Sequence, residues 1–413
     1  MPDATTAQIP AHVPPELVRS FPLIIGEYTD EDPFKRLIPL VHEGPAIFYN
    51  TKVYPGHGPA WVLRRMDDLR SLYLDTEHYS TKDMAPFAAL LGETWAMIPT
   101  ELDPPEHGVF RTLVNPLFSP KKMEALESKV REAARRYIGK FQARGKCEFM
   151  SEFAFPFPVS VFLDLVDLPQ ERMENFLEWE FMLLHAPDVA TLQKGARLVV
   201  DYLRGVIDER RLHPKDDFIS FAVQAQMQGR KLTDDELVGF CFNLFIGGLD
   251  TVSTNMGLHF RHLAENQEHQ KRLREDPAFI PTAMEELLRA FAAVTTFRTC
   301  IKETQLSGVT IKPGDRVAMC TTLACRDPEF YERPNEVLLD RAPAHLTFAS
   351  GPHRCIGSHL ARRELLIALQ EFLSAIPTFQ IEPGATIMTH LGGMVQPKTL
   401  PLVWKPETVP GCV

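Results

Sequence analysis

Cysteine is scarce in this chain of 413 residues, which has seven, an odd number scattered along its length. No two of them are spaced as Cys-x-x-Cys, the pattern of most structural zinc sites. A few scattered cysteines fit a reducing compartment better than a disulfide framework. The composition therefore argues against a zinc-stabilised module and a small disulfide-rich secreted domain, and we expect a cytoplasmic protein.

Long apolar runs and an excess of positive charge are also missing. Residues 1–15 are polar and contain proline, without the charged start and apolar run of a signal peptide. The most apolar stretch, residues 237–249, is shorter than the roughly 20 residues of a membrane span. The formal net charge is -10, whereas a surface that binds nucleic acid is basic. We expect a monomer that binds neither a membrane nor a nucleic acid.

The sequence has no internal repeat, low-complexity tract or linker that would divide it. Its 45% of hydrophobic and 24% of charged residues are typical of a globular protein. A chain of this length can bury a large core and still keep an internal cavity. We therefore predict a single domain over residues 1–413, with an extended arm at residues 1–30.

Helical periodicity dominates the middle of the chain, and β-like patterns lie on both sides of it. The clearest helices are predicted at residues 123–141, 192–210, 234–262 and 357–375. A hairpin is predicted from the apolar runs 46–49 and 60–63, and further strands at residues 294–325 and 379–404. The predicted fold is mainly α, with small β-sheets at its edges.

Cys355 has the most specific surroundings of the seven cysteines, in the segment Phe348-Ala-Ser-Gly-Pro-His-Arg-Cys-Ile-Gly357. It precedes a predicted helix, so its sulfur would lie near the positive end of the helix dipole. Backbone N–H groups there and the adjacent Arg354 favour the thiolate over the thiol. An isolated cysteine is most often a buried structural residue, but the glycines on both sides would let the backbone approach a flat ligand closely.

The long helix predicted over residues 234–262 contains Gly247-Gly-Leu-Asp-Thr251 in its interior. Each glycine costs about 1 kcal/mol in a helix relative to alanine. An acid beside a threonine in an apolar helix adds a desolvation cost. Two interpretations are open at this point: a kink between packed helices, or a groove that admits a ligand.

Glu286-Leu-Leu-Arg289 places an acid and an arginine on the same face of a predicted helix. Such a pair is common on solvated surfaces, so alone it indicates little. Taken together, however, the three segments resemble the cytochrome P-450 superfamily, most closely its bacterial camphor 5-monooxygenase branch. The resemblance covers almost the whole chain and also includes the segments 12–18, 98–100, 102–106, 359–364 and 400–404.

The resemblance implies the cytochrome P-450 fold, a triangular and mostly helical prism, and a haem b whose iron takes the thiolate of Cys355 as axial ligand. Thr251 would hydrogen-bond O2, and Asp250 would relay protons to it. The glutamate–arginine pair would contact a further arginine, either Arg341 or Arg333. By the same resemblance, further contacts to the haem are assigned to Thr100, His107, Arg111, Gly247, Arg298, Phe348, His353 and Gly357.

Members of this family insert one oxygen atom of O2 into an apolar substrate. In the camphor branch the electrons pass from NADH through a reductase and a 2Fe–2S ferredoxin. Arg362 and Arg363, with Arg111, would dock an acidic ferredoxin, although a plain solvated helix face explains them equally well. A peroxide-driven peroxygenase and a non-catalytic haem-thiolate sensor are the alternatives; Asp250 and Thr251 argue against the first, and no feature of the sequence supports the second.

The substrate pocket is where this chain departs from the camphor enzymes. Trp95 replaces a tyrosine that donates to the ketone, and Asn243 replaces a leucine. Ala186 and Glu178 replace the arginine and lysine that pair with the helix aspartate, so the control of Asp250 is expected to differ. The pocket suits a compact terpenoid of about ten carbons, such as cineole or ionone, with camphor bound weakly. Its predicted lining residues are Phe87, Trp95, Asn243, Ile246, Val294, Thr296 and Met394.

Overall fold

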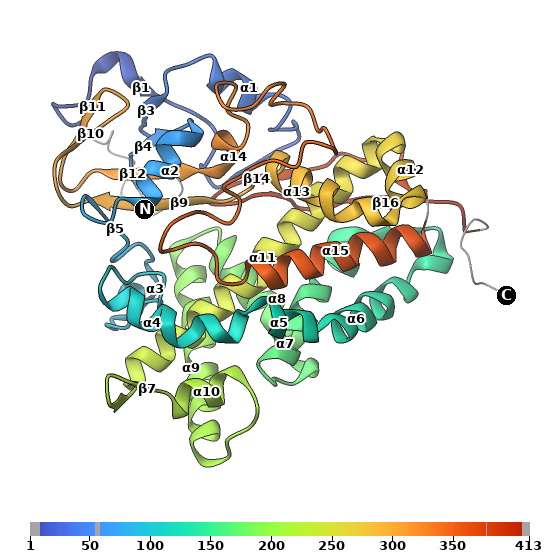
Figure 1. Cartoon of the computed structure of the whole chain (residues 1–413), viewed down its shortest axis with the longest axis horizontal. Helices are drawn as coiled ribbons and strands as arrows, with labels where there is room; N and C mark the ends of the chain where they lie inside the picture. The colour runs from blue at the N-terminus through green and yellow to red at the C-terminus, as the bar shows by residue number, and fades with distance from the viewer. Residues whose placement is uncertain (1–8, 54–57, 377, 407–413) are drawn as a thin grey trace. The chain divides into compact units, whose positions relative to one another are not determined.

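The computed structural model describes residues 9–53, 58–376 and 378–406 (Figure 1). The chain forms two compact units, and each is built from several stretches of sequence. The first unit combines residues 1–84, 282–355 and 386–398, and the second combines residues 85–281, 356–385 and 399–413.

A six-stranded sheet organises the first unit. β3 (Ile47–Asn50) and β4 (Ala60–Leu63) form the predicted antiparallel hairpin, and all their residues are buried. β12 (Arg316–Cys320) pairs in parallel with β4 and antiparallel with β9 (Thr295–Cys300). The edge strands are β1 (Val18–Arg19) and β5 (Tyr79–Ser80), which gives the order β1-β3-β4-β12-β9-β5.

The remaining parts of the first unit are smaller. The predicted N-terminal arm, described from residue 9, contributes β1 to the large sheet and β2 (Glu27–Thr29) to a three-stranded one. That sheet has the order β15-β14-β2, with β14 (Thr389–Leu391) and β15 (Val395–Pro397), and β10 (Thr304–Leu306) pairs with β11 (Val309–Ile311). The helices are α1 (Leu37–His42), α2 (Met66–Leu74), α13 (Ile280–Ala290) and α14 (Thr321–Ala324), with a 3-10 turn at Pro15–Leu17.

The second unit is mainly helical, and its longest helix is α11 (Asp234–Glu265). α11 begins at a capping box, because the Thr233 hydroxyl accepts the Glu236 N–H at 3.2 Å and the Glu236 carboxylate accepts the Thr233 N–H at 2.7 Å. α9 (Val189–Leu212) and α15 (Ser358–Ala375) contain the residues where helices were predicted. The other helices are α3 (Phe87–Leu91), α4 (Glu106–Val114), α5 (Pro120–Ala125), α6 (Glu127–Gly139), α7 (Pro156–Leu165), α8 (Met173–Leu184), α10 (Phe218–Gln224) and α12 (Gln267–Glu275).

Two details of the second unit differ from or extend the prediction. The helix predicted at residues 123–141 is two helices, α5 and α6, because the chain turns at Leu126, whose N–H donates to Met123 O at 3.3 Å. The predicted C-terminal strands pair with a strand before α7: the order is β13-β16-β6. These strands are β6 (Lys146–Glu148), β13 (Gln380–Ile381) and β16 (Pro401–Val403), and a short hairpin joins β7 (Gln226–Met227) and β8 (Arg230–Lys231).

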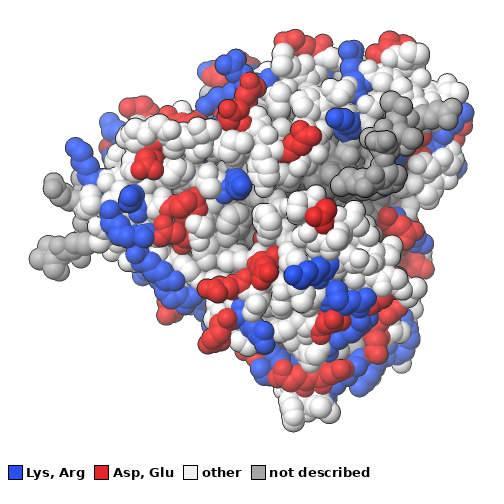
Figure 2. Space-filling view, turned by 180° about the vertical axis from the view of Figure 1, so that it is seen from behind, with Lys and Arg blue, Asp and Glu red and all other residues white. Residues whose placement is uncertain are grey.

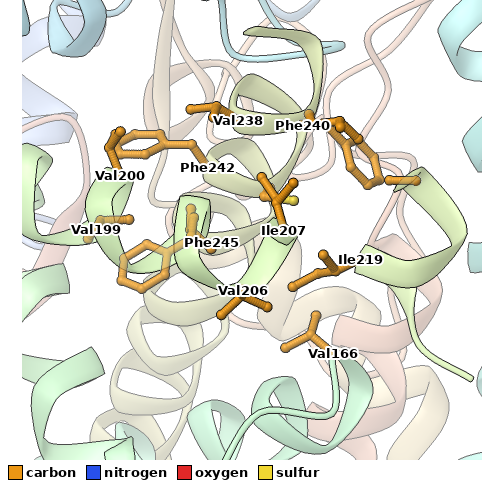
Figure 3. Close-up of a cluster of buried hydrophobic side chains, with 14 of the residues drawn as sticks. Val166, Val199, Val200, Val206, Ile207, Ile219, Val238, Phe240, Phe242 and Phe245 are labelled. Atoms are coloured by element: carbon orange, nitrogen blue, oxygen red, sulfur yellow. The ribbon is translucent and has the colours of Figure 1, made fainter. Parts of the chain in front are cut away.

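α11 is the centre of the second unit's core. It is long and apolar enough to cross a membrane by length and composition, but 67% of its apolar window is buried inside the protein, as in a core helix. Figure 3 shows where α9 and α11 pack together. Its labelled side chains are Val199, Val200, Val206 and Ile207 of α9, Val238, Phe240, Phe242 and Phe245 of α11, Ile219 of α10, and Val166.

Charged side chains of both signs are interspersed on the face shown in Figure 2. Many such charges are paired on the surface of the second unit. Lys215 Nζ lies 2.8 Å from Asp167 Oδ2, and Arg211 pairs with Asp234 at the start of α11. Exposed pairs of this kind contribute little stability each.

Candidate functional site

Cys355 ends a loop of the first unit that is closed by its own backbone. The Cys355 N–H donates to Phe348 O at 2.9 Å, and the Arg354 N–H donates to Gly351 O at 3.1 Å. Gly351 has a φ of 67°, and a Cβ there would lie 2.5 Å from Tyr73 O, so only glycine fits this close approach. Of the six described cysteines, Cys355 alone is exposed, while Cys147, Cys241, Cys300, Cys320 and Cys325 are buried.

The segment that leads into this loop is fastened to α13. His345 Nε2 lies 2.9 Å from Glu285 Oε2, and the Thr347 hydroxyl donates to Leu288 O at 2.8 Å. The Leu346 N–H also donates to Cys325 Sγ at 3.4 Å. The loop therefore presents an exposed sulfur from a rigid support, which is what an axial metal ligand requires.

Glu286 and Arg289 form a fully buried ion pair in α13, with Arg289 Nε 2.7 Å from Glu286 Oε2. Arg289 also donates to the carbonyls of Cys325, Pro334 and Glu336 at 2.7 to 2.9 Å. Arg341 is the third member, because its Nε donates to Glu286 Oε1 at 3.1 Å. Arg333 instead pairs with the exposed carboxylate of Glu336. Of the two arginines considered from the sequence, Arg341 therefore completes the network.

α11 passes through Gly247 and Gly248 as a continuous helix, and the two glycines have different surroundings. A Cβ on Gly248 would lie 2.7 Å from Phe162 Cδ2 of α7, so this glycine permits close helix packing. A Cβ on Gly247 would meet no heavy atom of the described residues within 4 Å. The Thr251 hydroxyl lies 3.5 Å from Gly247 O on the same face. The structure therefore shows close helix packing at Gly248 and open space beside Gly247 among the described residues, without a break in α11.

Asp250 is completely buried, and its partners come from α8 and the residue that ends it. Its Oδ2 lies 3.2 Å from His185 Nε2. Glu180 Oε1 lies 3.9 Å from the same imidazole nitrogen. Burial, followed by the nearby Asp250 carboxyl group, raises the pKa of Glu180 well above its ordinary value. Glu178, one of the residues considered from the sequence, is exposed.

The predicted haem contacts are spread over both units. In the first, Arg298 of β9 is half-buried, donates to Phe297 O at 2.6 Å and has its guanidinium 5.9 Å from the centre of the Tyr73 ring. His353 is half-buried in the cysteine loop. In the second, His107 and Arg111 lie one turn apart on α4 and so share a face of that helix.

Two of the predicted pocket residues have polar groups that are engaged within the protein. The single N–H of Trp95 donates to Glu93 Oε2 at 2.7 Å, and Glu93 is held by Arg197 and Arg204 at 2.7 and 2.8 Å. Because the indole ring has only one donor and Glu93 accepts from it, Trp95 does not replace the hydrogen bond that the tyrosine of the camphor enzymes gives to the ketone. The amide oxygen of Asn243 accepts the Thr100 hydroxyl at 2.7 Å, so Thr100, a predicted haem contact, binds Asn243.

The other predicted pocket residues have apolar side chains, except for Thr296. Phe87 and Trp95 both pack on Phe242 of α11, with ring centres 5.1 and 4.8 Å apart. Val294 and Met394 form an isolated β-bridge, and the Thr296 hydroxyl lies 3.4 Å from the Tyr73 hydroxyl. Ile246 precedes Gly247 on α11 and is half-buried.

Comparisons with known proteins agree with these features. Residues 159–399 match the cytochrome P450 family. A probable cytochrome P450 127A1 of Sinorhizobium fredii is 40% identical over 406 residues, which cover 97% of each chain. The crystal structures of cytochrome P450 CYP101C1 and of CYP101J2 superpose on this chain with TM-scores of 0.86 and 0.85. Their sequences are 33% and 32% identical to it, and each alignment covers 96% of this chain and 100% of the other chain. The chain belongs to the cytochrome P450 family.

The comparisons confirm the predicted fold and the camphor 5-monooxygenase-like branch. Because they align 96% of the chain with one known fold, the two units are parts of a single P450 fold. Cytochrome P450 enzymes are oxidoreductases with a haem held by a cysteine thiolate. The residues present fit this group, because an exposed cysteine ends a loop closed by its own backbone, and the described residues leave open space beside Gly247 of α11.

Sequence reasoning did not find His185 and Glu180. A signal for Glu180 was present, because it lies four residues after Phe176 and three before Leu183, on the buried face of an apolar helix. His185 carried no comparable signal, since it ends α8 and its contact with Asp250 spans 65 residues.

Proposed function

We propose that this P450 hydroxylates a compact, apolar terpenoid with O2, and that its electrons come from NADH through a reductase and a 2Fe–2S ferredoxin. The observation that carries the proposal is the composition of α11, where Asp250 and Thr251 lie three and four residues after Gly247, beside which the helix face is open. A cytoplasmic, monomeric enzyme fits this reaction. The peroxygenase alternative is less well supported, because the residues after Gly247 are those of a proton relay rather than an arginine–carboxylate pair.

Cys355 is the residue we assign to the iron, and His353, Arg298, His107 and Arg111 supply donors for the propionates. When bound, the haem supplies the activation of O2, and its thiolate ligand favours cleavage of the O–O bond. The protein's own residues hold and move protons. Thr251 presents a hydroxyl on the open face of α11, and Asp250 is placed one residue before it to replace the proton that this hydroxyl gives up.

The assignment of Cys355 has a simple spectroscopic test. Cys355→Ser should abolish the red-shifted carbon monoxide band of the reduced protein, because that band depends on a thiolate ligand. Cys300→Ser is the matched control: Cys300 is buried, and a serine can keep its hydrogen bond to Lys302 O. If Cys355→Ser kept the band, another residue would have to be the ligand.

An apolar substrate is proposed because the polar groups of the predicted pocket are largely engaged. With the Trp95 N–H bound to Glu93 and the Asn243 oxygen bound to Thr100, shape rather than hydrogen bonding must supply most of the selectivity. The test is titration of the ferric protein with camphor, cineole, ionone and a medium-chain fatty acid. We expect a spin-state shift with cineole or ionone and a weak one with camphor. A full shift with the fatty acid alone would refute the proposal.

The monooxygenase reaction is tested by product yield per NADH in the presence of a ferredoxin system. Thr251→Ala should bind substrate normally but divert reducing equivalents to peroxide, and Asp250→Asn should slow turnover on the order of a hundredfold. Ser253→Ala is the control, since the Ser253 hydroxyl is buried against Leu249 O at 2.9 Å. Product formed from peroxide but not from NADH would favour the peroxygenase, and product from neither would favour the sensor.

The ferredoxin would dock through basic residues of α15 and α4. Arg362 and Arg363 lie near the start of α15, and Arg111 lies on α4. Arg363 is paired with Glu127 of α6, which lowers its contribution to a docking field. The expected signature is reduction by ferredoxin whose rate falls with ionic strength.

A further inference from the structure

Three ionisable side chains meet inside the second unit, where α8 packs against α11. They are Glu180, His185 and Asp250, whose side chains are 6%, 5% and 0% exposed. One carboxylate oxygen from each acid and one ring nitrogen of His185 all lie within 4.8 Å of one another. This cluster takes the place of the basic residues that were expected to pair with Asp250 but are absent from the sequence.

Two carboxyl groups this close and this deeply buried cannot both be ionised. Glu180 is the group that burial and the neighbouring Asp250 carboxyl group keep protonated. The titratable group facing Glu180 from α11 is Asp250, and the one from the end of α8 is His185. α7 and α9 also pack on α8, but no charged group among their described residues shifts the pKa of Glu180.

We propose that Glu180 and Asp250 share one proton, and that His185 holds Asp250 in place and returns protons to the pair from the surface. The proposal rests on the role of Asp250 given under Proposed function and extends the relay by two residues. His185 is suited to the outer position, because it ends α8 and its ring stacks on the exposed ring of Phe181, with ring centres 5.6 Å apart.

The proton movements balance within the three groups. Asp250 takes the shared proton from Glu180, which becomes a carboxylate. Protonated His185 then restores the proton of Glu180 through its Nε2, 3.9 Å from Glu180 Oε1 and 3.2 Å from Asp250 Oδ2, and is itself reprotonated from solvent. Asp250 gives its proton towards Thr251 and becomes a carboxylate again. After one passage each group is back in its starting state.

The shared proton is tested in the resting, haem-loaded protein, without turnover. The infrared difference spectrum of wild type minus Glu180→Gln should show the C=O band of a buried carboxylic acid at neutral pH, and the band should shift in deuterium oxide. Glu178→Gln, an exposed acid on the same helix, should leave the band unchanged. If the spectrum shows no such band, or if zinc is found at this cluster in stoichiometric amount, the proposal is wrong.

The relay is tested by turnover. Glu180→Gln is isosteric and neutral, so substrate affinity and spin state should not change. Its turnover should fall at least about tenfold, less than for Asp250→Asn, and its solvent isotope effect should rise. His185→Gln keeps a donor to Asp250 but cannot carry a proton, so it should keep the infrared band while turnover loses its dependence on pH. Unchanged isotope effects and pH profiles in both variants would reduce the cluster to a structural role and refute the relay.

These measurements separate the two proposals. If the infrared band is present but the wild type forms no product from NADH, the shared proton stands and the proposed function fails. If the wild type forms product but Glu180→Gln matches it in rate and isotope effect, the proposed function stands and the relay fails.

Discussion

Gly247 and Gly248 are adjacent, and their replacement by alanine should have opposite effects on stability. Removing a glycine from a helix interior stabilises the protein by about 1 kcal/mol. At Gly247 nothing opposes this gain among the described residues, because a Cβ there lies in open space. At Gly248 the Cβ would lie 2.7 and 3.1 Å from two ring carbons of Phe162, which is 7% exposed and packed in the core. Overpacking of this kind costs about 1 to 3 kcal/mol.

The two variants should therefore differ by about 1 to 3 kcal/mol in the free energy of unfolding, with Gly248→Ala the less stable. Guanidinium titration followed by circular dichroism is the suitable assay, because in a chain of this size 1 kcal/mol moves the melting temperature by only about 1 °C. Carbon monoxide binding to the reduced haem gives the second measurement. Gly247→Ala should slow it and Gly248→Ala should not, if the space at Gly247 faces the haem. Equal stabilities, or slowed binding in Gly248→Ala alone, would refute the assignment of the two glycines.

Three other predictions follow from single contacts. Arg341→Ala should destabilise the protein by about 2 to 4 kcal/mol, because it removes a charged partner of the buried Glu286 carboxylate. Arg333→Ala should cost less than about 1 kcal/mol, because its ion pair is exposed. Equal losses of stability in chemical denaturation would contradict this difference. Trp95→Phe should change the affinity for neutral terpenoids less than about threefold, since the indole N–H binds Glu93. A larger loss of affinity in a spin-state titration would show that this N–H donates to the substrate. Burial raises the pKa of Glu364 above its ordinary 4.5, so as the pH rises above that value the unfolded chain ionises first and the wild type loses stability. Glu364→Gln cannot ionise, so its stability relative to the wild type should increase with pH. A difference in stability that stays constant across pH would contradict this.

The parts of the site that could be predicted from the sequence are those whose geometry is local. The cysteine loop, the helix after it and the glutamate–arginine pair each lie within a few neighbouring residues, so spacing alone predicts which side chains share a face. The choice between Arg341 and Arg333 could not be made in this way. Both follow α13 in the same irregular segment, and only the folded chain shows that Arg341 reaches Glu286.

The partner of Asp250 shows the same limit more clearly. The sequence indicates that the basic residues expected at positions 178 and 186 are absent, but an absence does not predict a replacement. His185 and Glu180 reach Asp250 because α8 packs on α11, which is a property of tertiary structure. A buried aspartate needs a partner that holds its charge or its proton. With an imidazole and a second carboxyl group in place of two cations, the cluster can store a proton but cannot fix Asp250 as a permanent carboxylate.

This difference in charge has a consequence for how the enzyme would be controlled. Cationic partners hold an aspartate by ion pairing, and the proton must come from elsewhere once those pairs break. A protonated Glu180 beside Asp250 is a proton source that needs no such opening. Delivery in this P450 would then depend on the refilling of Glu180 through His185 rather than on the separation of an ion pair. Control by pH should therefore be stronger than control by ionic strength, because a buried pair is screened little by salt.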